Sequence, residues 1–221
     1  MGKVKTFITA MSLQEKGETL EKDKLQPVIY HALGYSKLKY GETRFPIIPV
    51  INGYADRGDS IRVIVILTEN EHAKHNYDTY FVKEMNDLVE KNGYLFDEIE
   101  IVRTPDREDV NTQIKLFGDL VKMLKGGEKI SACMTYGTKP GLIVQFAAIN
   151  YAVRIKNKSP LDCIGCIAYG RYLHKEKIGR IYDQTSLFYM ELMINRLAEQ
   201  KVEDAENVLR IFLEDGGEDN G

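Results

Sequence analysis

The run Ile61-Arg-Val-Ile-Val-Ile-Leu67 constrains the fold of this chain more than any other stretch. It is almost continuously apolar and rich in β-branched residues, which is typical of a strand buried on both faces of a parallel sheet. Val4–Thr9 has the same character. Because parallel strands must be joined by long crossovers, the segments between such strands should contain helices. These two runs predict an α/β domain with two central parallel strands.

The rest of the first 170 residues alternates as this fold requires. Apolar residues recur at helical spacing between strand-like runs, and Asn-Gly or Gly-Gly pairs follow two of the predicted helices. The pattern predicts a doubly wound, mostly parallel Rossmann-like sheet, with ligands at the carboxyl ends of its strands. The predicted elements are helix 71–91, strand 96–102, helix 109–124, strand 129–135, helix 140–155 and strand 163–169.

One segment interrupts the alternation after the first strand. Tyr35–Tyr40 and Thr43–Val50, with Gly41-Glu42 between them, predict an inserted β-hairpin at about residues 35–52. The second of these segments contains two prolines, which exclude a central position in a sheet. We therefore expect a flap or an edge ribbon.

Two helical segments, Thr185–Glu199 and Val202–Leu213, follow the last predicted strand. Their apolar residues form a surface wide enough for packing or dimerisation. The last 20 residues carry a net charge of −6, as expected of a solvated acidic tail. We expect a Rossmann-like domain at residues 1–180 and a C-terminal helical extension with an acidic tail at 181–221.

Composition excludes several classes of protein. The chain has 221 residues, of which 43% are apolar and 29% charged, so it can build a core without a metal or disulfides. No apolar run is long enough to cross a bilayer, and the first ten residues do not resemble a signal peptide. The net charge of −3 excludes a broad face for duplex nucleic acid. We expect a cytoplasmic protein without a membrane anchor or a cofactor.

The cysteines favour the same interpretation. Their number is odd, and Cys133 and Cys163 lie in apolar runs, which is typical of buried thiols in a reducing compartment. Cys163-x-x-Cys166 lacks a second pair of ligands, so core packing is favoured over a metal or redox site. No metal site is expected.

The loop within residues 133–140, Cys-Met-Thr-Tyr-Gly-Thr-Lys-Pro, carries the strongest functional signal. A strand stops at Thr135, and Thr138 is placed to cap the helix that follows. Gly137 allows the backbone to approach a ligand closely, and free amides together with Lys139 attract an anion. The spacing is neither that of a Walker loop nor G-x-G-x-x-G. Spacing alone leaves a phosphate site and a plain strand-to-helix turn equally open.

This loop resembles the signature of the CARF family, the CRISPR-associated Rossmann fold. In that family a strand ends in Asp-x-Thr-His-Gly or in x-Thr-Gly-Gly-Thr-Lys-Pro before a long apolar helix. Cys133 and Tyr136 stand here in place of the acid and the imidazole of one family version. The similarity runs over roughly residues 3 to 170 and includes the turn Thr9–Ser12, the segment around Tyr40 and Arg44, and the loop Thr104–Asp109.

The resemblance implies binding of a cyclic oligoadenylate, in particular cyclic tetra-adenylate, in type III CRISPR antiviral signalling. The pocket would lie across the two-fold axis of a homodimer, since a symmetric ring suits a symmetric site. The chain would be a stand-alone sensor, a ring nuclease or the sensor part of a longer effector. The ligand-binding residues that the resemblance implies are Thr9, Ala10, Met11, Ser12, Thr68, Glu69, Thr135, Tyr136, Gly137, Thr138 and Lys139.

Some CARF proteins also cleave the ring. No metal is needed when a ribose 2′-hydroxyl attacks the adjacent phosphorus and leaves a 2′,3′-cyclic phosphate, because the protein must only align the groups and neutralise charge. Lys139 and Thr138 are the candidate catalytic residues. The alternatives are an unrelated Rossmann-like enzyme or regulator that binds a mononucleotide at the same turn, and an interaction scaffold without a ligand.

Histidines and tyrosines give weaker signals. His72 and His75 lack the spacing and the third ligand of a zinc site, so we expect them to be solvent-exposed. Four tyrosines are candidates for stacking on adenine, although ordinary packing explains them as well: Tyr30, Tyr35, Tyr40 and Tyr54.

Overall fold

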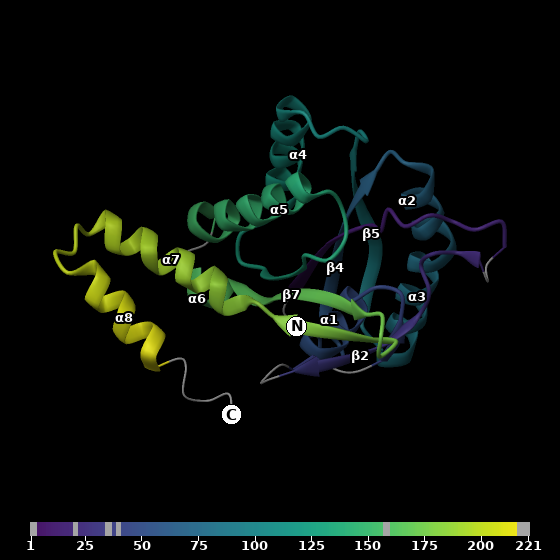
Figure 1. The fold of residues 1–221 in the computed structure, drawn as a ribbon, viewed down its shortest axis with the longest axis horizontal. Coiled ribbons are helices and arrows are strands. Elements are labelled where there is room, and N and C mark those ends of the chain that lie inside the picture. The colour runs from purple at the N-terminus through teal and green to yellow at the C-terminus, as the bar shows by residue number, and fades with distance from the viewer. Residues whose placement is uncertain (1–3, 20–21, 34–36, 39–40, 157–159, 216–221) are drawn as a thin grey trace. The chain divides into compact units, whose positions relative to one another are not determined.

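The computed structural model describes residues 4–19, 22–33, 37–38, 41–156 and 160–215 (Figure 1). Among these residues, eight strands form one mixed sheet in the order β3-β2-β8-β7-β6-β1-β4-β5. Neighbours from β7 to β5 pair in parallel, as do β2 and β8, whereas β7–β8 and β2–β3 are antiparallel. The strands are β1 (Val4–Ala10), β2 (Val28–Leu33), β3 (Gly41–Thr43), β4 (Ser60–Thr68), β5 (Leu95–Thr104), β6 (Lys129–Cys133), β7 (Ile164–Leu173) and β8 (Ile178–Asp183).

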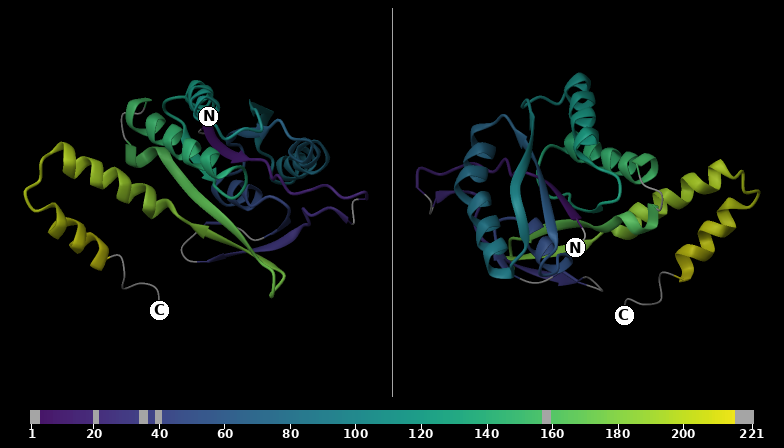
Figure 2. Two further views of the ribbon diagram at one scale, coloured as in Figure 1. Left: turned by 45° about the horizontal axis from the view of Figure 1, so that its top comes forward. Right: turned by 180° about the vertical axis from the view of Figure 1, so that it is seen from behind.

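Helices cover both faces of this sheet, with α1 and α3 on one face and α4 and α5 on the other (Figure 2). The chain is therefore an α/β protein with a mostly parallel sheet. It divides into two compact units, residues 1–183 and 184–221. The helices of the first unit are α1 (Ile47–Tyr54), α2 (Glu71–Asn76), the π-helix η2 (Tyr77–Phe81), α3 (Val82–Asn92), α4 (Val110–Met123), α5 (Lys139–Tyr151), the π-helix η3 (Ala152–Lys156) and α6 (Pro160–Cys163). The second unit contains α7 (Thr185–Glu199) and α8 (Ala205–Asp215).

The central strands are buried as their sequences predict. Residues 63–67 of β4 are all buried. Since successive side chains of a strand point to opposite faces, Val63 and Val65 join the core beneath α1 and α3, while Ile64 lies on the other face. Burial on both faces explains why this run contains so few polar residues.

The predicted strand Thr43–Val50 is wrong. β3 ends at Thr43, and α1 begins at Ile47 and buries its apolar face in the core. Pro46 occupies the N-cap of α1, and Pro49 lies in the first turn, where a missing N–H leaves no hydrogen bond unmade. The prolines thus start a helix rather than protect an edge strand. β3 does lie at the edge of the sheet, paired with β2, and most of Tyr35–Tyr40 lies outside the described residues.

β8 was not predicted from the sequence. It pairs with β7 on one side and β2 on the other, although its sequence Ile-Gly-Arg-Ile-Tyr-Asp has little apolar pattern. Gly179 is needed there because a Cβ at this position would lie 2.5 Å from the ring of Tyr30. Pairing with neighbours, rather than local sequence, makes this segment a strand.

The segment between β1 and β2 is tied to α2 and η2 through the buried carboxylate of Asp23. This group accepts hydrogen bonds from Tyr80, from the backbone N–H of Gly17 and from His75 Nε2, the last at 3.0 Å. His75 is therefore part of a packed network, contrary to the expectation that it is simply exposed. Burial alone would raise the pKa of Asp23, but the hydrogen bonds from Tyr80 and His75 outweigh it and lower the pKa to about 2.

This lowered pKa makes stability depend on pH. Because the pKa of Asp23 is lower in the folded chain than in the unfolded one, the unfolded state binds more protons between about pH 5 and pH 2. The free energy of unfolding should fall by roughly 1 to 2 kcal/mol over this range on account of Asp23, allowing for screening. Urea denaturation at several pH values should show a flatter profile for Asp23→Asn. Asp87→Asn, which removes an exposed carboxylate on α3, should keep the profile of the unchanged protein.

None of the helices in the described part of the chain has the length and apolar character needed to cross a bilayer. The three cysteines are buried and form no disulfide, as the sequence predicts. Cys163 ends α6 and Cys166 lies in β7. Within the described residues, no group of three His, Cys, Asp or Glu side chains is placed to hold a metal ion.

Candidate functional site

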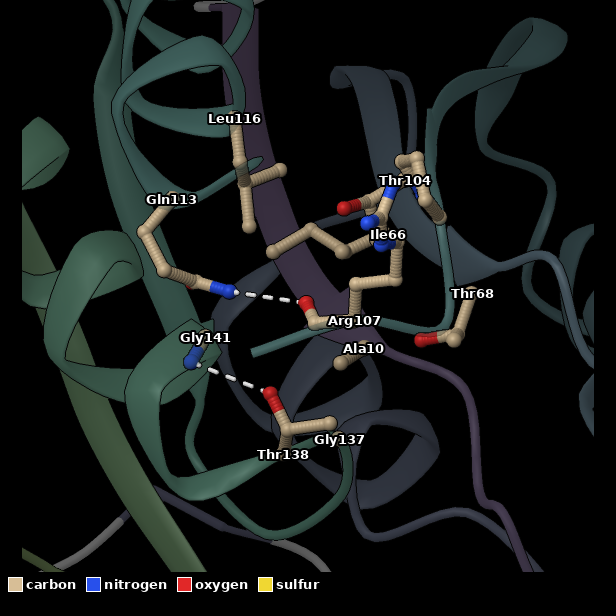
Figure 3. Close-up of a pocket in the computed structure, with 11 residues that line it drawn as sticks. Ala10, Ile66, Thr68, Thr104, Arg107, Gln113, Leu116, Gly137, Thr138 and Gly141 are labelled. Carbon is tan, nitrogen blue, oxygen red and sulfur yellow. Dashed lines mark hydrogen bonds between the residues drawn. The ribbon is translucent and has the colours of Figure 1, made fainter. Parts of the chain in front are cut away.

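A small crevice opens at the carboxyl ends of β1, β4 and β5 (Figure 3). In the sheet, β1 lies between β4 and β6. Open α/β sheets bind ligands at the carboxyl ends of such neighbouring strands, where the connecting loops diverge to the two faces. The crevice is narrow, with a cavity volume of about 10 Å³, which is about the space that one water molecule needs. Its lining consists of Ala10, Ile66, Thr68, Thr104, Pro105, Arg107, Gln113, Leu116, Gly137, Thr138 and Gly141.

The loop from β6 to α5 has the geometry that its sequence predicts. Thr138 is the N-cap of α5, and its Oγ1 accepts a hydrogen bond from the N–H of Gly141 at 3.2 Å. Pro140 lies in the first turn of the helix. Gly137 has a φ of +100°, which favours glycine, and a Cβ there would lie 2.8 Å from the Cβ of Ala10. A side chain at residue 137 would therefore push this loop away from β1.

Gly137→Ala should destabilise the protein by about 1 to 3 kcal/mol, because the backbone strain adds to the close contact with Ala10. Gly118→Ala is the matched control, since Gly118 lies within α4 and a Cβ there meets nothing within 4 Å. The free energy of unfolding of Gly118→Ala should be unchanged or higher by up to about 1 kcal/mol. Urea denaturation measures both, and equal stabilities would show that the loop tolerates a side chain.

Two cations lie near the crevice. Arg107 contributes to its lining, with its Nε 3.7 Å from Asp109 Oδ2, and its carbonyl oxygen accepts from Gln113 Nε2 at 3.3 Å. Lys139 is the first residue of α5 and is exposed just beyond the lining. Pro140 has no N–H and that of Gly141 is bound to Thr138, so it is the positive end of the α5 dipole, together with these two charges, that makes the edge suitable for an anion such as a phosphate.

Sequence reasoning did not single out Arg107. The available signal was its position in the loop Thr104–Asp109, directly after β5, because the loops after neighbouring parallel strands meet at one edge of the sheet. Gln113 and Leu116 of α4 were missed for a different reason. They reach the crevice only because α4 packs beside α5, which the sequence does not reveal.

Of the predicted ligand residues, Ala10, Thr68, Gly137 and Thr138 are brought together in the lining. Glu69 and Lys139 are exposed outside it. Three residues at or just after the end of β1 are buried and do not line the crevice: Thr9, Met11 and Ser12. Met11 belongs to the core beneath α1 and α3, and the hydroxyl of Ser12 accepts from the N–H of Gln14 at 3.2 Å.

Thr135 and Tyr136 hold the loop in place rather than line the crevice. Thr135 Oγ1 accepts from the N–H of Gly170 at 2.7 Å, which ties the end of β6 to β7. Tyr136 packs edge-on against Phe45 and donates its hydroxyl hydrogen to the carbonyl oxygen of Arg44 at 2.9 Å. Burial raises the pKa of Tyr136 far above its usual value, so this phenol stays protonated at neutral pH.

Comparison with models of known protein families finds no match for this sequence, and comparison with curated proteins finds no significant one.

Proposed function

We propose that this chain binds cyclic oligoadenylate, most readily cyclic tetra-adenylate, as a cytoplasmic sensor in type III CRISPR antiviral signalling. The observation that carries the proposal is the β6–α5 loop, in which Gly137 packs on Ala10 and Thr138 caps a helix start flanked by Lys139. Such a loop can hold a phosphate through the positive end of the helix dipole and a lysine charge. Arg107 supplies a second charge from the neighbouring loop.

In this proposal, residues 1–180 form a CARF-like Rossmann domain. Of its inserted segment at about residues 35–52, the described structure has the edge strand β3 and most of α1, and α7 and α8 form its helical extension. A separate effector domain or protein would receive the signal if the chain acts only as a sensor.

The size of the crevice favours a homodimer. With a cavity volume of about 10 Å³, one crevice cannot enclose a ring, so a symmetric ligand would lie over the crevices of two copies, each contacting half of it. A candidate surface for the second copy lies on the same helices that line the crevice, since Gln113 belongs to α4 and Gly141 to α5. Exposed apolar residues of these helices are Val110 (68% exposed) and Ile114 (64%) on α4 and Ile143 (71%) on α5. Burial of these exposed apolar side chains between two copies would favour dimerisation.

Ile143→Glu should therefore give a monomer at concentrations where the unchanged protein is a dimer, because a charge would be buried in the interface. Light scattering in the presence of cyclic tetra-adenylate measures the mass. Leu187→Glu is the control for the alternative surface, since Leu187 is exposed on α7. A dimer that dissociates only in Leu187→Glu would assign the interface to α7, and a monomeric unchanged protein would contradict the dimer itself.

Slow ring cleavage without a metal is the second part of the proposal. Thr138 and Lys139 would stabilise charge on the phosphoryl oxygens while the site aligns the 2′-oxygen for attack on phosphorus. The protonated Tyr136 is tied to Arg44, so no role is assigned to it. Excess protein incubated with cyclic tetra-adenylate in EDTA should yield linear products with a 2′,3′-cyclic phosphate. Rings that stay intact after hours would leave a pure sensor.

Calorimetry with cyclic tetra-adenylate, cyclic hexa-adenylate and AMP tests the ligand class. Tight binding of a ring at one ring per two chains is the expected result. Binding of AMP alone would instead support the alternative, a Rossmann-like protein that binds a mononucleotide at the same loop. No binding of any of the three would overturn the proposal.

A further inference from the structure

A second, larger pocket lies at the opposite edge of the sheet from the crevice. It is formed by the amino ends of β1, β6 and β7 together with the carboxyl end of α1 and the loop that follows it. Its volume is about 460 Å³, which is in the range of small-molecule sites. Its lining consists of Lys5, Lys37, Gly53, Tyr54, Asp56, Asp59, Lys129, Ser131 and Gly165.

The acidic groups of this pocket are already paired. The ammonium group of Lys5 donates to the carbonyl oxygen of Tyr54 at 2.8 Å and lies 3.0 Å from Asp56 and 2.5 Å from Asp59. Burial raises the pKa of Asp59, but its hydrogen bonds with Lys5 and with the backbone N–H of Asp56 outweigh this effect, so the pKa is lowered. Asp59 therefore stays ionised beside Lys5, and these three side chains form a closed cluster that has little to offer a bound cation.

Of the remaining polar groups, the Tyr54 hydroxyl donates to Asp183 Oδ2 at 3.1 Å, whereas that of Ser131 has no protein partner among the described residues. Ser131 is only 3% exposed, lines the pocket and makes no side-chain hydrogen bond with a described residue. Gly165 leaves room for the Ser131 hydroxyl, because a Cβ at residue 165 would overlap with it. A hydroxyl that opens into a pocket without a protein partner is free to donate to a ligand or to water.

The charges that are left are positive. Lys37 and Lys129 line the pocket, and neither forms an ion pair with a described residue. Lys129 and Ser131 are two residues apart in β6, so their side chains point to the same face of the sheet. A hydroxyl donor in the same pocket as two ammonium groups is suited to an anionic oxygen, which accepts hydrogen bonds and carries the compensating charge.

We propose that this pocket binds a small molecule through a phosphate or carboxylate group, which accepts from Ser131 and is neutralised by Lys37 and Lys129. The volume exceeds what a single anionic group fills, so the ligand carries an organic body beside Tyr54. The site is separate from the crevice and does not depend on the function proposed for it.

Amide NMR titrations of the full chain with inorganic phosphate and with malonate, against chloride at equal ionic strength, test this site. The amide signals of Ser131 and Gly165 should shift and saturate. The anion that binds more tightly identifies the group as phosphate or carboxylate. Shifts at Gly137 and Thr138 report on the crevice, so failure at one site is distinguishable from failure at the other.

Three variants sharpen the test. Lys129→Glu and Ser131→Ala should each weaken anion binding in this pocket by fivefold or more. For Ser131→Ala, the affinity is measured from the amide signal of Gly165. Lys83→Glu, the same charge change on an exposed residue of α3, should leave it unchanged. Absence of saturable shifts at Ser131 and Gly165 with both anions would overturn the proposal. Equal affinities in Lys129→Glu and Lys83→Glu would overturn it as well.

Discussion

Lys139→Ala is expected to weaken the binding of cyclic tetra-adenylate by more than tenfold. The side chain is exposed at the start of α5, and the positive end of the helix dipole beside it favours a phosphate at the same place. A charge-assisted contact with a phosphate contributes about 1.5 to 3 kcal/mol, which corresponds to at least tenfold in affinity. Calorimetry of the unchanged and variant proteins measures the difference.

The loss should be specific to binding. Because Lys139 is exposed, its removal should change the free energy of unfolding by no more than about 0.5 kcal/mol. Lys83→Ala removes an exposed lysine from α3, far along the chain from the loop, and should bind the ring as the unchanged protein does. Unchanged affinity in a folded Lys139→Ala protein would move the ligand site away from the β6–α5 loop.

Arg62→Ala is expected to reduce the free energy of unfolding by about 3 to 5 kcal/mol, the usual cost of leaving a buried charge without its partner. Arg62 lies in β4, and its guanidinium contacts Glu100 at 2.7 Å and Glu128 at 2.6 Å. The Glu128 side chain is only 9% exposed, and Thr6 would remain as its hydrogen-bond donor. Urea denaturation at neutral pH measures the loss.

A double variant separates the ion pair from simple packing. Arg62→Met combined with Glu128→Leu replaces the more buried pair of this cluster by apolar groups of similar size and leaves Glu100, whose side chain is 28% exposed, to be solvated by water. It should therefore be more stable than the sum of the two single changes predicts, by at least about 1 kcal/mol. Additive losses would show that the two residues act independently and that the buried charge is not the cause.

Elements with strong local signals were predicted within a few residues. β1 and β4 follow from their apolar, β-branched runs, which only a strand buried on both faces explains. α4 and α5 follow from helical spacing and from their caps, Asp109 and Thr138. The β6–α5 loop belongs to this group because glycine, a capping threonine and proline each act within one turn.

Other elements depend on residues far away in the sequence. The segment Thr43–Val50 has the composition of a strand, yet Ile47 and Ile51 become one face of a helix because the core beneath it is already apolar. β8 becomes a strand through pairing with β7 and β2. Neither outcome can be derived from propensity, since tertiary contacts override it.

For the candidate site, the sequence by itself determined the local geometry of the β6–α5 loop and the edge of the sheet at which it lies. The tertiary structure decided which side chains reach that edge. Ala10 lines the crevice. Its neighbours Thr9 and Met11 point the other way because successive side chains of a strand alternate, and they are buried in the interior. Arg107 lies there because β5 ends at the same edge. Local signals act over one turn of chain, whereas the composition of a pocket depends on the packing of segments that are far apart in the sequence.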